Sequence, residues 1–349
     1  MGNITDMNQE KQPSPELFLN AVMAYRDSAA VKGAVELDVF SAIARGVNNA
    51  EALAGQCRAD KRGMRILCDY LCIMGMLEKS GTAYSLTTDS AVFLDRNSPA
   101  FMGDIVNFLL DPFFIRDIGD VAEAVRKGGV ATSIAGSDVP DHPMWVKFAR
   151  SMTGLNQLPA SLLADLVCAD LDGEDVEEQV RVLDIAAGSG VFGITLAEKH
   201  PQAEVTAVDW PDVLEVALEN ARNAGLDNRY RTIPGSAFEV DTGTGYRVIL
   251  LCNFLHHFDP ATCSEFLLRM KKALAAGGKV YTLDFVPNED RISPPFAAAF
   301  AMQMLRQTVA GDTYTVAEYE AIFAAAGLQV EQANPLSGTP YAAIVAGHA

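Results

Sequence analysis

The stretch that decides the fold runs from Val180 to Asp209 and reads VRVLDIAAGSGVFGITLAEKHPQAEVTAVD. It begins with an apolar, β-branched run over residues 180–185, and the Gly-Ser-Gly turn at residues 188–190 lets the chain reverse into a helix near Val191. A second apolar strand, residues 205–208, then leads to an acid, Asp209. This order predicts a βαβ unit with a nucleotide-like ligand at its first turn.

Two ligands compete for this turn. Gly188, Gly190 and Gly193 satisfy G-x-G-x-x-G, and Asp209 lies about twenty residues further on, as a dinucleotide site such as that for NAD requires. Asp184, however, would end the first strand beside the turn, where its carboxylate would repel a pyrophosphate. S-adenosylmethionine (SAM) has no phosphate and carries an ammonium and a sulfonium. The acid therefore favours SAM over NAD, with the Asp209 carboxylate accepting both ribose hydroxyls.

Composition limits the class of protein. The chain has 349 residues, of which 49% are hydrophobic and 21% charged, so it is long enough for two globular domains. The net charge of −18 argues against nucleic acid or an anionic membrane as the main partner. Residues 1–13 lack the pattern of a signal peptide and no long apolar run offers a membrane span, which predicts a cytoplasmic protein. Six scattered cysteines indicate reduced thiols and no structural zinc.

Residues 1–105 predict a helical domain of the winged-helix type. Apolar side chains recur at helical spacing over residues 16–44, with a break at Gly33, and two helices follow over residues 50–56, capped by Asn49, and 61–74. A hairpin is expected over residues 77–86. Basic side chains at the start of the second helix would suit DNA, but its very apolar continuation favours burial against a second copy of the chain. A homodimer is the favoured interpretation.

Residues 106–349 predict a catalytic domain. Its helical segment, residues 106–170, places Trp145, Phe148 and Met152 at helical spacing, where they pack in the core or form the roof of a pocket for a flat apolar substrate. Residues 171–349 then alternate strand and helix in a Rossmann-like α/β core. Two final strand candidates, residues 329–333 and 341–345, suit a seven-stranded sheet whose last strand is antiparallel.

The carboxyl ends of the predicted strands should meet in one crevice. Asp184, Asp209, residues 235–238, residues 253–258 and Asp284 all lie at such ends. His256 and His257 are the most informative, because histidine is the natural base near neutral pH for removing a phenolic proton, and Asp284 could orient the imidazole. Alternatively, one histidine only caps the turn. A metal site formed by these three residues is less favoured, since adjacent histidines rarely converge on one ion.

Several motifs together resemble a known family. The D-x-A-x-G-S-G run is similar to motif I of the class I SAM-dependent methyltransferases. With the winged-helix N-terminal part, L-H-H-F-D-P and G-G-K-V-Y-T-L-D, it resembles the dimeric small-molecule O-methyltransferases, which include plant caffeate and isoflavone enzymes, the acetylserotonin type and bacterial relatives. The resemblance implies that SAM is converted to S-adenosylhomocysteine without a metal, and it suggests a role in secondary metabolism.

The resemblance also assigns residues. His256 falls on the catalytic base, His257 where an acid usually stands, and Asp284 on the acid that orients the base. Ser236 replaces the aspartate that holds the adenine amine, and Thr313 replaces a second glutamate. The cofactor-binding residues expected are Asp184, Ala186, Gly188, Gly190, Asp209, Trp210, Ser236, Ala237, Phe238, Asn253 and Phe254. The substrate-facing residues expected are Trp145, Phe148, Met152, Phe300, Met304 and Leu305.

The predicted function is methyl transfer from SAM to a hydroxyl of a small aromatic or polyketide-like compound, with a histidine base. Relatives in this family also methylate carbon or nitrogen, or use the fold for decarboxylation or pericyclic rearrangement, and these alternatives stay open. From another class, a SAM-sensing regulator would place the winged helix on DNA. The acidic net charge speaks against that alternative.

Overall fold

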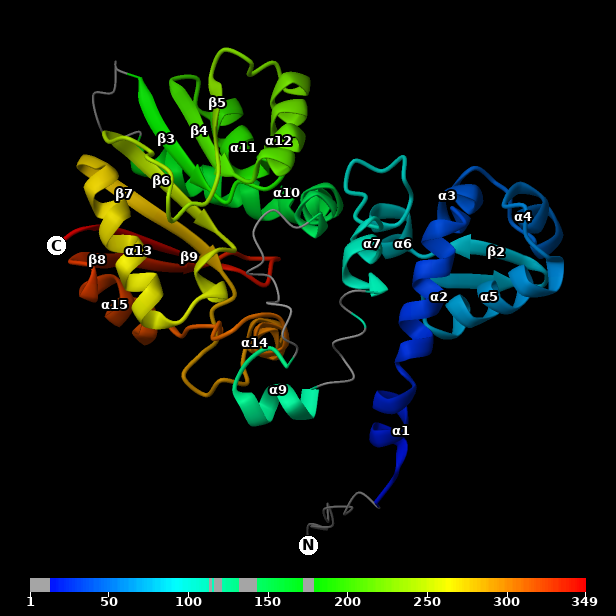
Figure 1. Ribbon diagram of the computed structural model, residues 1–349. Helices are drawn as coiled ribbons and strands as arrows, with labels where there is room; N and C mark the ends of the chain where they lie inside the picture. Colours follow the sequence, from blue (N-terminus) through cyan, green and yellow to red (C-terminus); the bar gives the residue numbers. More distant parts are fainter. Residues whose placement is uncertain (1–12, 113–114, 116–120, 132–142, 172–178) are drawn as a thin grey trace, which may run out of the picture. The chain divides into compact units, whose positions relative to one another are not determined.

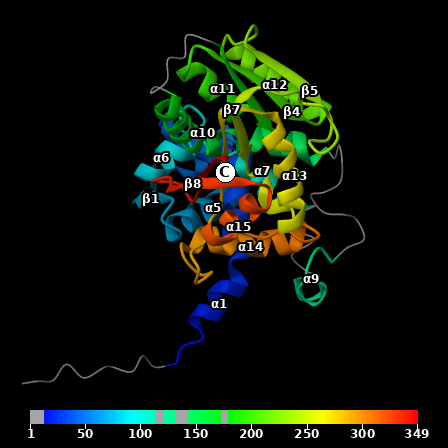
Figure 2. The same cartoon turned by 90° about the vertical axis from the view of Figure 1, so that its left-hand side faces the viewer.

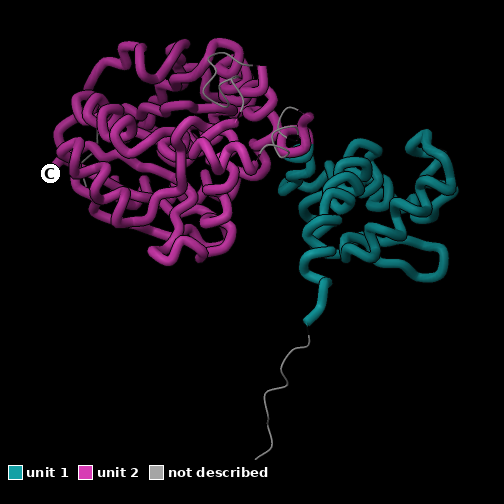
Figure 3. The backbone as a smooth tube through the Cα atoms, turned by 60° about the horizontal axis from the view of Figure 1, so that its bottom comes forward, with its two compact units in different colours: residues 1–106 teal, residues 107–349 magenta. Residues whose placement is uncertain are grey.

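The structure is a computed structural model that describes residues 13–112, 115, 121–131, 143–171 and 179–349 (Figure 1). The chain folds as two compact units, residues 1–106 and 107–349 (Figure 3). Within the described residues, no helix is long and apolar enough to cross a bilayer.

The first unit is mostly helical and contains one small hairpin. Its elements are α1 Glu16–Met23, α2 Tyr25–Glu36, α3 Val39–Ala44, α4 Ala50–Gln56, α5 Lys61–Ile73, β1 Leu77–Ser80, β2 Ala83–Leu86 and α6 Thr88–Phe93. Asn49 and Asp60 cap α4 and α5, because their side chains accept hydrogen bonds from Ala52 N and Gly63 N. Helix, helix and hairpin therefore follow one another as expected.

The predicted break at Gly33 is wrong. Gly33 lies inside α2, and the chain changes helix at Ala24 and again at Leu37 and Asp38, where Asp38 has a left-handed φ of 56°. One glycine costs a helix only about 1 kcal/mol relative to alanine, which neighbouring contacts readily offset. A glycine in an apolar helical pattern was therefore a poor marker of a helix end.

The second unit begins with helices and continues as alternating strands and helices. Helices α7 Ile105–Leu109, α9 Val121–Lys127 and α10 Met144–Leu171 come first. The remaining elements are β3 Val180–Ile185, α11 Val191–Lys199, β4 Ala203–Asp209, α12 Pro211–Asn223, β5 Tyr230–Pro234, β6 Tyr246–Cys252, η2 Leu255–His257, α13 Pro260–Ala273, β7 Leu274–Asp284, α14 Pro295–Gln307, α15 Val316–Ala325, β8 Leu328–Pro335 and β9 Ala342–His348.

One seven-stranded sheet organises this unit, in the order β5-β4-β3-β6-β7-β9-β8. Strands β3 to β7 are parallel, whereas β9 runs antiparallel between β7 and β8. The strand order reverses between β3 and β6, so their carboxyl ends flank the crevice where open α/β sheets bind ligands. The predicted seven strands and antiparallel last strand are confirmed.

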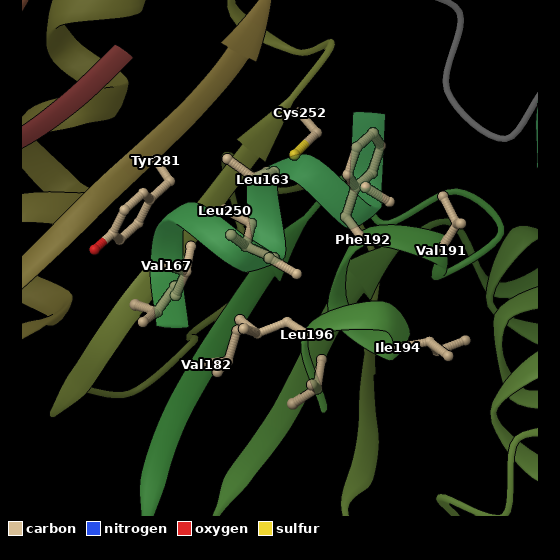
Figure 4. Packing of buried hydrophobic residues seen from close by; sticks show 14 of the residues in the cluster. Leu163, Val167, Val182, Val191, Phe192, Ile194, Leu196, Leu250, Cys252 and Tyr281 are labelled. Atoms are coloured by element: carbon tan, nitrogen blue, oxygen red, sulfur yellow. The ribbon is translucent and has the colours of Figure 1, made fainter. Parts of the chain in front are cut away.

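Helices cover both faces of the sheet (Figure 2). Alternate strand residues such as Val182 and Leu250 pack under α10 and α11 on one face, and Leu183 and Ile249 pack under α13 and α15 on the other. Figure 4 shows how Leu163 and Val167 of α10 and Leu196 of α11 converge on the first face. Because helices cover both faces of the sheet, its strands are nearly continuous apolar runs. The polar residues therefore lie at the carboxyl ends of the strands.

Candidate functional site

A pocket lies at the carboxyl edge of the sheet, within the second unit. It is bounded by α10, the turn after β3, the ends of β4 and β5, and the segment after β6. Its lining residues are Trp145, Phe148, Ala149, Met152, Asn156, Ala186, Ala187, Gly188, Ser189, Val191, Phe192, Val208, Asp209, Trp210, Val213, Gly235, Ser236, Ala237, Phe238, Cys252, Asn253, Phe254, His257 and Phe258. The segments at the carboxyl ends of β3, β4, β5 and β6 therefore line one crevice, whereas Asp184 and Asp284 are not among its lining residues.

The glycine turn after β3 forms one wall. Gly188 and Gly190 have positive φ values of 57° and 77°, which only glycine adopts without strain. Ala186 in the same turn and Asn253 at the end of β6 also have positive φ values, of 53° and 54°, and both line the pocket. Non-glycine residues in this conformation are uncommon and concentrate at functional sites. The backbone is thus shaped for a ligand on both sides of the crevice.

Asp209 holds the turn in place. Its Oδ2 accepts a hydrogen bond from Gly188 N at 2.8 Å, and its Oδ1 accepts one from Trp210 N at 2.7 Å. Burial raises the pKa of Asp209 to about 6, although both backbone N–H groups favour the ionised form. The carboxylate lines the pocket, where ligand hydroxyls could donate to its remaining lone pairs.

Asp184 lies beneath the turn and does not line the pocket, contrary to expectation. Its side chain is 1% exposed, and its Oδ2 accepts a hydrogen bond from Gly193 N at 3.1 Å. Strand alternation directs this side chain under α11. A Cβ on Gly193 would lie 2.7 Å from Asp184 Oδ2, so the third glycine of the motif makes room for the acid. Burial raises the pKa of Asp184 to about 7. Gly190 also lies outside the lining and caps α11.

Two buried acceptors in the lining suggest the kind of ligand. Asn156 Oδ1 on α10 and Asn253 Oδ1 have no hydrogen-bond partner in the described part of the chain, and the Asn156 side chain is 5% exposed. Buried polar atoms without partners are rare, so both need donors from a ligand or water. Among the described lining residues there is no lysine or arginine to hold a pyrophosphate. Acceptors and a carboxylate fit SAM, which presents an ammonium, ribose hydroxyls and an adenine amine.

An aromatic cluster forms the wall beyond β5. The Phe238 ring lies 5.0 Å from that of Phe258 and 6.0 Å from that of Phe254, and Ser236 Oγ accepts from Phe238 N at 3.3 Å. Arg269 of α13 fixes this loop, since its guanidinium donates to the carbonyls of Ala237, Phe238 and Val240. The loop therefore offers flat apolar surface beside one hydroxyl, as an adenine ring requires.

His256 and Asp284 form a buried pair beside the pocket. His256 Nδ1 lies 2.6 Å from Asp284 Oδ1, and the two side chains are 3% and 0% exposed. Asp284 Oδ1 also accepts from Phe285 N at 2.8 Å, and its Oδ2 accepts from Tyr319 Oη at 2.8 Å. The carboxylate thus fixes the tautomer of His256, leaving Nε2 as the unprotonated nitrogen.

His257 faces the pocket directly. Its ring centroid lies 4.5 Å from that of His256 and 6.0 Å from that of Trp145. Burial lowers the pKa of His257 well below its usual range, and the neighbouring His256 adds to this effect. His257 therefore remains a neutral imidazole at physiological pH.

The predicted substrate-facing residues divide into two groups. Trp145, Phe148 and Met152 line the pocket from α10. Phe300, Met304 and Leu305 of α14 are not among the lining residues. Met304 is buried, whereas the Phe300 ring stacks on Phe285 at 4.0 Å and lies 5.1 Å from His256. The α14 side of the site is therefore closed over His256 by aromatic rings. Within the described residues no cluster of three acids, histidines or cysteines could hold a metal ion.

Comparisons with known proteins agree with this geometry. Residues 140–329 match the model of an O-methyltransferase domain, and residues 19–96 match that of an O-methyltransferase dimerisation domain. A 3-hydroxy-5-methyl-1-naphthoate 3-O-methyltransferase from Streptomyces sahachiroi is 28% identical over 311 residues, covering 87% of each chain.

Two solved structures are also similar. A Nostoc punctiforme protein assigned as an O-methyltransferase is 51% identical, with a TM-score of 0.90, covering 96% of this chain and 99% of that one. Human N-acetylserotonin methyltransferase in complex with SAM is 22% identical with a TM-score of 0.81, covering 98% of this chain and 99% of that one, and it shares the fold.

Proposed function

Because this chain belongs to the SAM-dependent O-methyltransferases, we propose that it methylates a hydroxyl of a small aromatic or polyketide-like compound with His256 as the general base. The observation that carries the proposal is the 2.6 Å contact between His256 Nδ1 and Asp284 Oδ1. A base oriented by a buried carboxylate is the arrangement that withdraws a proton from an attacking hydroxyl.

The residues that would hold SAM follow from the pocket. Asp209 would accept the ribose hydroxyls, Ser236 and Phe238 would contact the adenine, and the buried acceptor Asn156 would take a donor from the methionine part. SAM supplies an electrophilic methyl group on its sulfonium. The chain's own part is to orient both reactants, which is worth up to about 7–11 kcal/mol in well-aligned systems.

His256 is favoured over His257 as the base. Nδ1 of His256 is paired with Asp284, so the carboxylate stabilises the imidazolium that forms when Nε2 takes the substrate proton. Burial and the neighbouring His256 lower the pKa of His257 well below its usual range, which makes its imidazole a poor acceptor for the substrate proton. We assign His257 to the pocket wall, where its ring lies edge-to-face with Trp145.

The acceptor is proposed to be flat and apolar. Trp145, Phe148 and Met152 present one face of α10 to the pocket, and Phe108 packs edge-to-face on Phe148. Among the relatives, one O-methyltransferase acts on a hydroxynaphthoate and another acts in tetracenomycin polyketide synthesis, which supports an aromatic or polyketide-like substrate here.

The chain is proposed to form a homodimer through its first unit. Residues 19–96 match a dimerisation domain, and large apolar side chains are exposed there, including Leu19, Val22 and Ile73. Exposed apolar surface of this kind marks an interface. Light scattering of the purified protein should give twice the chain mass, and a monomer at micromolar concentration would contradict the proposal.

The test of function begins with deuteromethyl-labelled SAM and an extract of the producing cells. Mass spectrometry should find a small molecule that carries the labelled methyl on oxygen. His256→Ala should lower turnover by about two orders of magnitude or more while SAM affinity stays nearly intact, because His256 lies outside the pocket lining. Unchanged turnover in this variant would remove the base assignment. A label on carbon or nitrogen would contradict O-methylation of this substrate.

A further inference from the structure

The carboxylate of Asp284 serves two side chains rather than one. Its Oδ1 faces His256 Nδ1 at 2.6 Å, while its Oδ2 accepts the hydroxyl proton of Tyr319 at 2.8 Å. Asp284 and Tyr319 are both 0% exposed, so water does not compete for either oxygen. Tyr319 comes from α15, 35 residues beyond Asp284. A buried phenol thus donates a hydrogen bond to the carboxylate that orients the base.

We propose that Tyr319 is a positioning residue for the catalytic base, acting through Asp284. The inference rests on the proposed function of His256. The Tyr319 hydroxyl holds Oδ2 so that Oδ1 stays directed at the imidazole, and it draws part of the negative charge away from His256. Tyr319 itself touches neither reactant.

The position of Tyr319 is fixed by its helix. The first turn of α15 carries a capping box, in which Thr315 Oγ1 accepts from Glu318 N and the Glu318 carboxylate accepts from Thr315 N. The ring of Tyr314 packs edge-to-face on that of Tyr319, with centroids 5.8 Å apart. Because the helix start is anchored at these points, the phenol is held in place before any substrate arrives.

Four other titratable groups near the pair, Cys252, Cys263, Tyr341 and His257, are uncharged near neutral pH. Burial raises the pKa of Cys252 and Tyr341 well above their usual ranges and that of Cys263 to about 12, and it lowers the pKa of His257. These groups face Asp284 or His256 from the end of β6, from α13, from the segment before β9 and from η2. The charge balance of the base therefore depends mainly on Asp284 and on the hydroxyl that binds it.

Tyr319→Phe removes this hydroxyl and keeps the ring. We expect kcat to fall about 10- to 150-fold with little change in the KM for SAM, because the carboxylate loses the one hydrogen bond that holds Oδ1 toward the imidazole. The freed carboxylate should stabilise the imidazolium more strongly. The acid limb of the pH–kcat profile should therefore move to higher pH by about half a unit.

Tyr246→Phe is the matched control. Tyr246 is equally buried, packs in the same core cluster and donates to the carbonyl of Thr242 at 2.6 Å, but it lies at the opposite end of β6. Loss of the Tyr246 hydroxyl should lower the melting temperature about as much as Tyr319→Phe does, but it should leave the pH–kcat profile unchanged. Identical kinetic changes in both variants would overturn the proposal, because they would show a general effect on stability. A Tyr319→Phe enzyme with the wild-type rate and profile would overturn it too.

A measurement that does not depend on turnover distinguishes the role of Tyr319 from the role of His256 as the base. In protein labelled at histidine, NMR titration of the His256 ring, assigned with His256→Ala, should show its midpoint moving upward in Tyr319→Phe. An unmoved midpoint overturns the role of Tyr319. If the midpoint moves while His256→Ala keeps full turnover, the proposed base fails but Tyr319 still positions the imidazole.

Discussion

The two sides of the site are built differently. On the cofactor side, between β3 and β4, backbone N–H groups hold the carboxylate of Asp209, which lines the pocket. On the base side, beyond β6 and β7, the side chains of His256, Asp284 and Tyr319 bind one another in a buried chain. The first side depends on local backbone geometry and the second on side chains distant in sequence. Substitutions should therefore separate SAM binding from turnover.

The largest effect is expected from Asp284→Asn on the base side. With its amide nitrogen at the Oδ1 position, the side chain would face two donors, His256 Nδ1 and Phe285 N. With its amide oxygen there, it would still accept from both but would lack the negative charge that stabilises the imidazolium. Turnover should fall by about two orders of magnitude or more, as expected when a base loses its orienting carboxylate, while S-adenosylhomocysteine affinity measured by calorimetry stays within about threefold. A parallel loss of S-adenosylhomocysteine affinity would show that the cofactor side and the base side do not act independently.

Asp209→Asn should give the converse result. An amide cannot accept hydrogen bonds from both Gly188 N and Trp210 N, because one of its positions is a donor. An unpaired buried donor costs about 1–3 kcal/mol, so SAM affinity should fall roughly 5- to 100-fold. Turnover at saturating SAM should change little. A variant that binds SAM normally but turns over slowly would contradict the assignment of Asp209 to the cofactor side.

The cofactor side should also respond to pH. The pKa of Asp209 is about 6, against a usual value of 3.8, so protonation weakens SAM binding as the pH falls below about 6, by up to about tenfold per unit. Calorimetry between pH 5 and 8 checks this, and Asp209→Asn should flatten the curve. An affinity independent of pH in the wild-type protein would refute it.

The stability of the ligand-free protein should depend on pH in the opposite direction to SAM affinity. The raised pKa values of Asp184 and Asp209, about 7 and about 6, mean that folding favours their protonated forms. Their contribution to the free energy of unfolding is thus fully present below pH 3.8, their usual pKa, and is lost as the pH rises through 6 to 7. At pH 8, Asp184→Asn should raise the melting temperature, whereas a fall at that pH would show that the charge itself is needed.

The smallest effect is expected from Arg269→Lys. A single ammonium cannot reproduce the guanidinium contacts with the carbonyls of Ala237, Phe238 and Val240. The adenine-facing loop should loosen and SAM affinity should fall about two- to fivefold, the equivalent of one surface hydrogen bond. Arg181→Lys, which disturbs a similar clamp on Thr244, is the control. Equal losses in both would show that the loop around Phe238 has no special role.

The difference between the two sides also explains which features of the site could be predicted from the sequence. The glycine turn, β3, β4 and the position of Asp209 at the pocket follow from one continuous stretch, because strand period and glycine conformations are local properties. The alternation of elements predicted the α/β core, and the two final strand candidates predicted the antiparallel last strand, whereas the order of the strands in the sheet was not predicted. Asp184 was misplaced, since its position at the strand end was correct but the strand period directs its side chain under α11.

The contributions of Asn156, Arg269 and Tyr319 were missed. Each lies on a helix whose pattern indicates only core or surface, and each acts through tertiary contacts. The two histidines and Asp284 were expected together, because strand ends share one sheet edge, but the direction of each ring depends on packing. One signal for Tyr319 was available in the capping box T-V-A-E over residues 315–318, which fixes the start of its helix at Val316 and ends directly before the tyrosine.

The place of β9 has a consequence for protein synthesis. β9 pairs with β7 through Asp284 and Ala342, so β7 stays an open edge of the sheet until residues 342–348 have left the ribosome. The nascent chain can form the glycine turn and its parallel strands much earlier. Asp284 would then gain its final strand neighbour only after residues 342–348 have emerged. A stalled ribosome with a chain shortened before Ala342 should therefore present a folded SAM side but an exposed strand edge, which is a site for chaperone binding or aggregation.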